Sequence, residues 1–195
     1  MKTRVPFLLF LGAVQASALD LTPRFVTTLS DGVSIRRPFF ADGARKYALT
    51  LNMETALEPY EDGALFRFVT LREASMRLRP SPFRVETKFR PESLNLYRET
   101  ARKLLPPTST QVELEAVVEN PMPINGWESL RFVFKHRTHT GEWGESITFL
   151  NITPEKQVIV QVHAPAPDFA QASERAWDIL RRWHELDSLK PPGGS

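Results

Sequence analysis

The chain has 195 residues, with 25 lysines and arginines against 23 aspartates and glutamates, and it contains no cysteine. Without cysteine it can form neither a disulfide framework nor a two-cysteine, two-histidine zinc finger, although the stretch HRTHTGE (136–142) resembles the linker between such fingers. The near balance of charge also gives no support for nucleic-acid binding, which depends on neutralising phosphates.

Residues 1–18 have the pattern of a secretory signal peptide. The basic segment MKTR precedes the apolar segment VPFLLFLGAV, and small residues follow at Ala16 and Ala18. The apolar segment is too short to span a bilayer, which needs about 20 residues. We therefore expect cleavage after Ala18, export to the periplasm or the medium, and no stable membrane anchor afterwards. Loss of Lys2 and Arg4 leaves 23 acidic residues balanced by an equal number of basic ones.

Four segments in the first half of the mature chain show the patterns of β-strands. Apolar residues recur at every second position in the clearest of them, and turn residues separate them. Pro80 and Pro82 predict a loop or a sheet edge after the last one. Residues 25–53 as a whole have strand character, and the four clearest segments are 33–40, 46–53, 64–71 and 74–79, with an acidic connection expected over 54–62.

Residues 90–107, RPESLNLYRETARKLLPP, have the pattern of an amphipathic helix. Pro91 suits the first helical turn, where its missing N–H costs nothing. Leu94, Tyr97 and Ala101 then fall on one face at helical spacing. The two prolines at the end of the segment terminate the helix.

The second half returns to strands, with the last three forming a meander. The expected strands are 112–119, 127–137, 146–153 and 157–163. We expect one face to carry Leu130, Phe132, Phe134, Ile147, Phe149, Val158, Val160 and Val162, and the other to carry Val133, Leu150, Ile152 and Ile159. Because both faces are partly apolar, a helix should cover each.

The segment 168–187, DFAQASERAWDILRRWHELD, is the second predicted helix. Asp168 and Gln171 resemble a capping box at its start, and an apolar stripe runs from Phe169 through Trp183 to its end. The prediction is therefore an α+β domain over residues 19–188, with an antiparallel sheet of about six strands between two amphipathic helices in an α/β/α sandwich. Residues 189–195, LKPPGGS, are expected to form a disordered tail.

The order of these elements resembles the PsbP-like family over roughly residues 30–186. The resemblance rests on GVSIRRP (32–38), the mid-chain helix, INGWESLRFVFKHR (124–137), VIVQVHAP (158–165) and ASERAWDILRRW (172–183). It implies an antiparallel sheet between helices and a binding or assembly role rather than catalysis. None of the family's functional residues maps onto this sequence. A cystatin-like or NTF2-like curved sheet around a helix remains the alternative topology.

A basic stretch and two tryptophans are candidate binding residues. The basic residues Arg77, Arg79, Arg84, Lys88 and Arg90 are interleaved with aromatics and could form a site for an anion or an acidic partner. The alternative is a solvated sheet edge, which basic side chains protect from aggregation. Trp143 and Trp177 are candidate interface aromatics, with burial against a neighbouring strand as the alternative for Trp177.

The histidines near the predicted hairpin turn raise the question of a metal site. His136 and His139 lie three positions apart, so in an extended strand they should point to opposite faces. Glu142 and Glu145 could complete a site only if the tip curls. His163, at a strand end, is expected to be an ordinary surface histidine. The pattern therefore predicts no bound metal and no cofactor.

No nucleophile motif and no glycine-rich phosphate loop occurs in the sequence. We therefore expect an exported, non-enzymatic binding or accessory domain whose partner is a protein or a small molecule. Two alternatives remain: a small exported enzyme whose site residues the sequence does not group, and a metal-handling protein that uses the hairpin histidines. A deep polar pocket would favour the enzyme.

Overall fold

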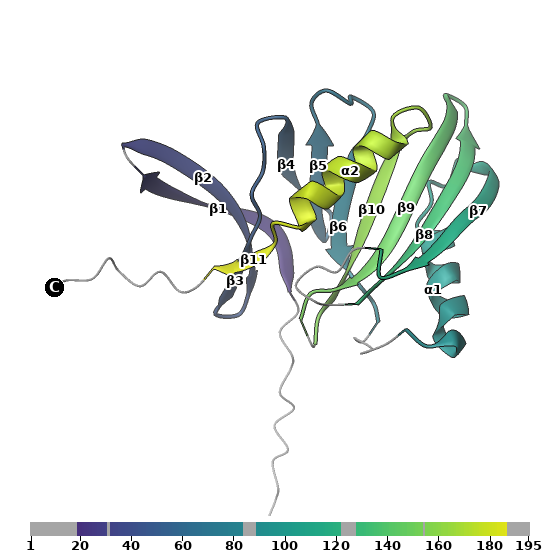
Figure 1. Ribbon diagram of the computed structural model, residues 1–195, viewed down its shortest axis with the longest axis horizontal. Coiled ribbons are helices and arrows are strands. Elements are labelled where there is room, and N and C mark those ends of the chain that lie inside the picture. The colour runs from purple at the N-terminus through teal and green to yellow at the C-terminus, as the bar shows by residue number, and fades with distance from the viewer. Residues whose placement is uncertain (1–18, 31, 84–88, 122–127, 154, 187–195) are drawn as a thin grey trace, which may run out of the picture.

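The computed structural model describes residues 19–186, apart from residues 31, 84–88, 122–127 and 154. Over this part the chain folds into two antiparallel β-sheets and two α-helices (Figure 1). In spatial order, the larger sheet contains β4 (Thr55–Tyr60), β5 (Gly63–Phe68), β6 (Ser75–Pro80), β10 (Gln157–Pro165), β9 (Gly141–Asn151), β8 (Ser129–Thr138) and β7 (Thr110–Glu119). The smaller sheet contains β1 (Asp20–Ser30), β2 (Val33–Asp42), β3 (Arg45–Ala48) and β11 (His184–Leu186). The predicted signal peptide and tail lie outside the described residues.

The α+β class with two amphipathic helices is confirmed, and the expected single sheet is wrong. The two sheets have 7 and 4 strands instead of one sheet with about six. One missed strand is β4, which lies in the supposed acidic connection; Leu57 packs against the core, and Pro59 is tolerated because β4 is an edge strand. β6 includes Pro80 and lies between β5 and β10 instead of at an edge, and residues 81–83 after it form the predicted loop.

Each face of the larger sheet is covered by one helix (Figure 1). The helix α1 (Pro91–Lys103) begins at the predicted proline and buries Tyr97 and Ala101. The ring of Tyr97 lies 4.8 Å from that of Phe149, centroid to centroid. The core on this face consists of Leu105, Leu130, Phe132, Phe134, Ile147 and Ile159 together with these three residues.

The register of the meander is partly as predicted. Leu130 lies opposite Phe149, so the expected pairing of β8 with β9 is confirmed. On β10, however, Ile159 lies opposite Phe149, whereas Val158 and Val160 face the other side. The expected register of β10 is therefore wrong by one residue. One face of β10 carries Val158, Val160 and Val162, and the other carries Ile159 between Gln157 and Gln161. Both faces of the sheet bury apolar residues, so the pattern within β10 does not decide which helix each face meets.

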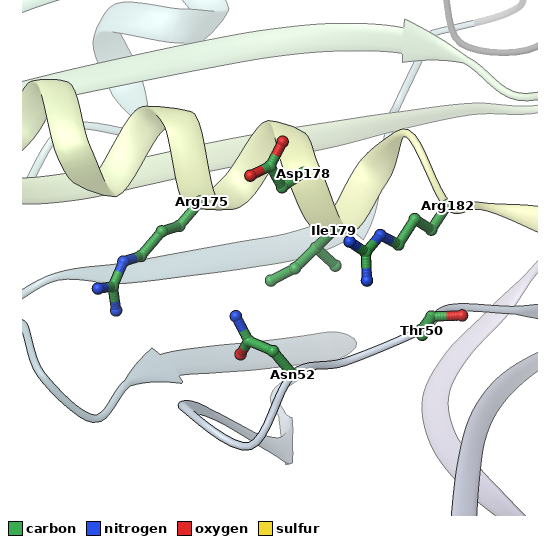
Figure 2. Close-up of a pocket in the computed structure, with 6 residues that line it drawn as sticks. All are labelled: Thr50, Asn52, Arg175, Asp178, Ile179 and Arg182. Carbon is green, nitrogen blue, oxygen red and sulfur yellow. The ribbon is translucent and has the colours of Figure 1, made fainter.

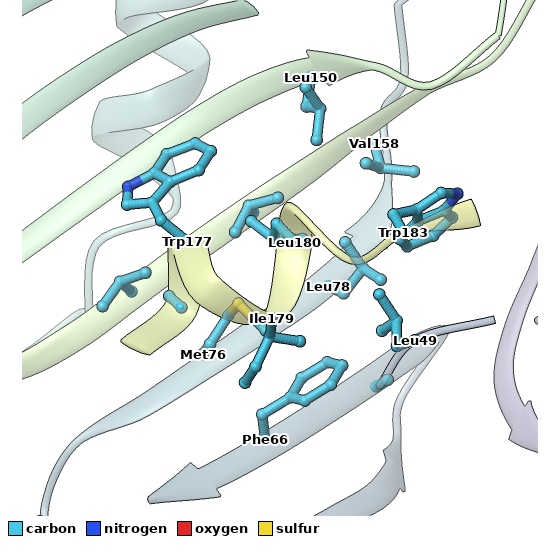
Figure 3. Close-up of a cluster of buried hydrophobic side chains, with 14 of the residues drawn as sticks. Leu49, Phe66, Met76, Leu78, Leu150, Val158, Trp177, Ile179, Leu180 and Trp183 are labelled. Atoms are coloured by element: carbon cyan, nitrogen blue, oxygen red, sulfur yellow. The ribbon is translucent and has the colours of Figure 1, made fainter. Parts of the chain in front are cut away.

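The helix α2 (Phe169–Leu180) covers the opposite face, over β10, β9 and β6. The predicted capping box is absent: Asp168 has helical backbone angles (φ −96°, ψ −9°) and makes no side-chain hydrogen bond to the helix. The helix also ends earlier than expected, because the chain leaves it after Leu180 and pairs with β3 as β11. Trp183, in the turn between them, is 2% exposed and joins the core under α2 (Figure 3).

The strands β1 and β2 form a hairpin that projects away from the larger sheet (Figure 1). We call this hairpin the arm. Its tip pairs Ser30 with Val33, and its base contributes the buried residues Leu21 and Phe40 to the core under α2. β1 is the outer strand of the smaller sheet.

Of the helices in the described residues, neither α1 nor α2 is long and apolar enough to cross a membrane.

Candidate functional site

Two histidines and a glutamate meet on three neighbouring strands of the larger sheet, on the face that α1 covers. His136 belongs to β8, Glu145 to β9 and His163 to β10. His163 lies directly opposite Glu145, and His136 lies opposite Trp143, two positions from Glu145. Residues directly opposite or diagonal in an antiparallel sheet share a face, so the pairing itself brings the three side chains together.

The carboxylate of Glu145 is the centre of this His–Glu–His cluster. One of its oxygens, Oε2, lies 2.5 Å from Nδ1 of His163 and 3.4 Å from Nε2 of His136. The other, Oε1, accepts a hydrogen bond of 2.6 Å from the side-chain amide of Gln161. The same amide donates to the backbone carbonyl of Leu104, just after α1, at 3.0 Å. The helix thereby helps to hold the carboxylate in place.

The cluster is shielded from solvent. The side chains of His136 and Glu145 are fully buried, whereas that of His163 is 22% exposed. The indole of Trp143 stacks on the imidazole of His163, with centroids 4.3 Å apart and planes 9° from parallel. His163 is thus the member of the cluster that solvent reaches.

Electrostatics keep the buried carboxylate ionised. Burial by itself raises the pKa of Glu145, because a charged group loses its hydration. The interactions with His136, His163 and Gln161 act in the opposite direction and outweigh burial, so the pKa of Glu145 lies below its ordinary value. A carboxylate and two imidazoles at this distance can bind a divalent cation or share a proton.

The histidine pair considered from the sequence is not the pair that the structure brings together. His139 is exposed in the two-residue turn, and Glu142 forms an ion pair with Lys135 at 3.6 Å. The expectation that His163 is an ordinary surface histidine is therefore wrong, and His136 is a buried residue within β8. The correct register of β10 would have revealed the cluster, because it places His163 opposite Glu145.

The predicted basic patch is only partly described. Arg77 and Arg79 lie on the same side of β6, and Arg84 and Lys88 lie outside the described residues. Arg79 forms an ion pair with Glu61 at 2.8 Å, and the guanidinium of Arg77 lies 4.7 Å from the centroid of the Tyr60 ring. Arg90 precedes α1 as its N-cap residue. The two arginines of β6 are engaged within the chain, and a five-residue anion site stays a prediction.

Trp143 and Trp177 were the candidate interface aromatics; exposure is wrong for Trp143, and for Trp177 the alternative of burial against a strand is confirmed. Trp143 is 9% exposed and Trp177 is 4% exposed. The hairpin turn is shorter than predicted, so Trp143 lies within β9 and stacks on His163 instead of standing in a loop. Trp177 faces the sheet, and the guanidinium of Arg131 lies 4.4 Å from the centroid of its ring. Each indole therefore offers little surface to a partner.

Two open depressions lie around the base of the arm. A groove of about 490 Å³ is lined by residues of the arm and of the segment between β3 and β4, among them Phe25, Ile35, Arg36, Arg37, Leu51 and Met53. A smaller hollow of about 60 Å³ shares Thr50 and Asn52 with the groove. Arg175 and Arg182 reach toward these two residues from α2 and the turn after it (Figure 2).

No protein-family model and no curated protein matches the chain. The solved structures to which it is similar include that of cyanobacterial PsbP (CyanoP) from Synechocystis, with 11% identity and a TM-score of 0.42 over 90% of this chain and 96% of that one. Another is a protein of unknown function from Pseudomonas aeruginosa, with 14% identity and a TM-score of 0.40 over 80% of this chain and 95% of that one. A solved PsbP structure is thus among the chains to which this one is similar.

Proposed function

We propose that the protein is an exported accessory domain that binds a partner protein, and that the arm with the groove at its base is the binding surface. The observation that carries this proposal is the concentration of exposed apolar side chains and unpaired arginines on the arm and around the groove at its base. The groove and the smaller hollow are open depressions, whereas the enzyme alternative calls for a deep polar pocket.

Exposed apolar side chains are concentrated on the arm and groove. Leu29 and Val33, on either side of the arm's turn, are 77% and 61% exposed. Phe25 and Met53, which line the groove, are 38% and 100% exposed. These four make up half of the large apolar residues that are exposed in the described chain. A soluble protein rarely groups such residues unless the surface binds something.

The charge of the surface indicates the chemistry of the partner. Arg36 and Arg37 line the groove and Arg182 lines the hollow beside it. Within the described residues none of the three forms an ion pair, although the guanidinium of Arg36 lies 3.8 Å from the centroid of the Phe25 ring. Unpaired cations beside apolar surface suit an acidic, partly apolar segment.

The backbone of the arm favours an extended partner. β1 is 11 residues long and is the outer strand of the smaller sheet; beyond its buried start at Leu21, its edge pairs with no other strand of the described residues and can accept a further one. A long open edge is a liability for aggregation unless something covers it. We infer that the partner segment is extended, acidic and partly apolar, and lies along β1 and into the groove. The export of the domain rests on the pattern of residues 1–18.

Peptide binding tests this proposal. Fluorescence anisotropy compares a labelled extended peptide of alternating glutamate and leucine with a matched peptide of alternating lysine and leucine. We expect the acidic peptide to bind the wild type, and added salt to weaken the complex. The double variant Arg36→Ala/Arg37→Ala should bind it about three- to tenfold more weakly, the effect of losing two exposed charge contacts.

The matched control removes two arginines from the exposed side of α1, Arg98→Ala/Arg102→Ala, and should bind like the wild type. Leu29→Asp/Val33→Asp should weaken binding further, because it places carboxylates on the apolar tip. The proposal is wrong if the lysine peptide binds as tightly as the acidic one. It is also wrong if the α1 double variant loses as much affinity as the arm double variant.

A further inference from the structure

We propose that His136, Glu145 and His163 form a binding site for one divalent metal ion of the zinc class, with solvent as the remaining ligand. The site is separate from the arm and does not rest on the proposed binding function. Two imidazole nitrogens and one carboxylate oxygen are a ligand set that zinc accepts in sites with an open position. The three candidate ligand atoms lie within 4.8 Å of one another.

One distance within the cluster already matches what a tetrahedral ion requires. Bonds of about 2.0–2.2 Å at tetrahedral angles place neighbouring ligand atoms about 3.3–3.6 Å apart. Nε2 of His136 and Oε2 of Glu145 are already 3.4 Å apart. Nδ1 of His163 lies 2.5 Å from the same oxygen, so metal binding requires these two atoms to move apart by about 1 Å. A small shift of the partly exposed His163 ring within the plane of its stack on Trp143 provides that movement, and the ion replaces the hydrogen bond.

The side chain of His136 is the second, independent observation. Its residue is 1% exposed, and neither ring nitrogen has a hydrogen-bond partner in the described structure. Buried polar groups are nearly always hydrogen-bonded, so a buried imidazole without a hydrogen bond indicates that a ligand can bind there. One of the orphaned nitrogens is the atom that faces the Glu145 carboxylate. An ion bound between them gives that nitrogen a partner.

The surroundings supply support for the ligands and a path to solvent. Gln161 donates to Oε1 of Glu145 and leaves Oε2 facing the histidines, as outer-shell partners of metal ligands do. Trp143 fixes the plane of the His163 ring by stacking on it. His163, whose side chain is 22% exposed, connects the cluster to solvent. The ligands themselves come from three strands of one sheet, which holds them more rigidly than a loop could.

Nδ1 of His136 lacks the hydrogen-bond acceptor that usually orients a metal-bound histidine. Loss of such a partner weakens metal binding by about 10–100-fold in known sites. We therefore expect one ion per chain with moderate affinity. Cobalt in the same site should give the strong visible absorption of tetrahedral coordination.

The proposal is tested by isothermal titration calorimetry, in which zinc chloride is added to the metal-free protein. We expect one saturable site in the wild type, and at least about tenfold weaker binding in His163→Gln, which keeps a hydrogen-bond donor for Glu145 but removes the imidazole. The matched control His139→Gln removes an exposed histidine in the adjacent turn and should bind like the wild type. Circular dichroism confirms that each variant is folded.

A second measurement separates the site from adventitious surface binding. Because Trp143 stacks on His163, saturation with zinc should change the tryptophan fluorescence of the wild type, and this change should be absent in Trp143→Phe. A wild type that takes up no zinc in a saturable manner overturns the proposal. Binding that survives in His163→Gln, or that disappears in His139→Gln, also overturns it. A negative peptide experiment on the arm leaves all of these outcomes unaffected.

Discussion

The indole of Trp183 lies stacked on the ring of Phe40, with centroids 5.5 Å apart and planes 20° from parallel. The ring of Tyr47 lies near the same indole, at 6.0 Å. Phe40 and Tyr47 belong to β2 and β3, whereas Trp183 directly follows α2. This one side chain therefore joins the smaller sheet to the core that α2 forms on the larger sheet.

Replacement of Trp183 by alanine should be strongly destabilising. Truncation of a buried tryptophan costs about 3–5 kcal/mol of the free energy of unfolding, because a cavity is left behind. Leu96→Ala is the control: Leu96 is 53% exposed on α1, and the change should stay within about 0.5 kcal/mol. Urea denaturation followed by circular dichroism measures both. Equal midpoints for the two variants would contradict the joining role of Trp183.

Gly144 is expected to tolerate no side chain. A Cβ atom built at this position would lie 2.3 Å from Cγ of Phe169, at the start of α2. Gly144→Ala should therefore push the helix from β9 and lower the free energy of unfolding by about 1–3 kcal/mol. In a Phe169→Ala background the same change should cost clearly less, because the clash is gone. Denaturant midpoints of the four proteins give the coupling, and strict additivity would show that the contact is unimportant.

The stability of the metal-free protein should depend on pH through Glu145. Its folded pKa lies below the ordinary value of 4.5, so its ionised form is favoured by folding. The stability that this gives is fully present above pH about 4.5 and is lost as the pH falls through the folded pKa. We expect the wild type to be more stable than Glu145→Gln near neutral pH, and the gap to shrink in acid.

Denaturant titrations at several pH values measure this gap, with a chelator present throughout. Glu142→Gln removes an exposed carboxylate from the same strand and should follow the wild-type curve. A gap between the wild type and Glu145→Gln that widens as the pH falls would show that the carboxylate is not held ionised by its histidine neighbours.

Export predicts a mature chain that starts at Leu19. Mass spectrometry of the protein from its native host should find this start, since Ala16 and Ala18 form the small-residue pattern of a cleavage site. Large residues at both positions should block cleavage, so that a precursor retaining Met1 accumulates. Wild-type protein that keeps Met1 would show that residues 1–18 are not a cleaved signal.

The sequence by itself determined the features that depend on local physics. Helical spacing and flanking prolines located α1, because these limits act within a few residues of the backbone. The apolar residues of both meander faces predicted a helix on each side. Two strands were missed for local reasons. Pro59 made the segment of β4 look like a loop, and the helical pattern that continues through Trp183 predicted a helix where β11 forms.

Only the tertiary structure decided which side chains meet. One register of β10 places Val158 and Val160 on the α1 face, and the other places Ile159 there. Each register buries apolar side chains, so the free energy of burial differs little between them. The pairing of β10 with β9 fixes the register, and with it the position of His163 opposite Glu145. The site depends on a shift of a single residue across strands, which no pattern within one strand encodes.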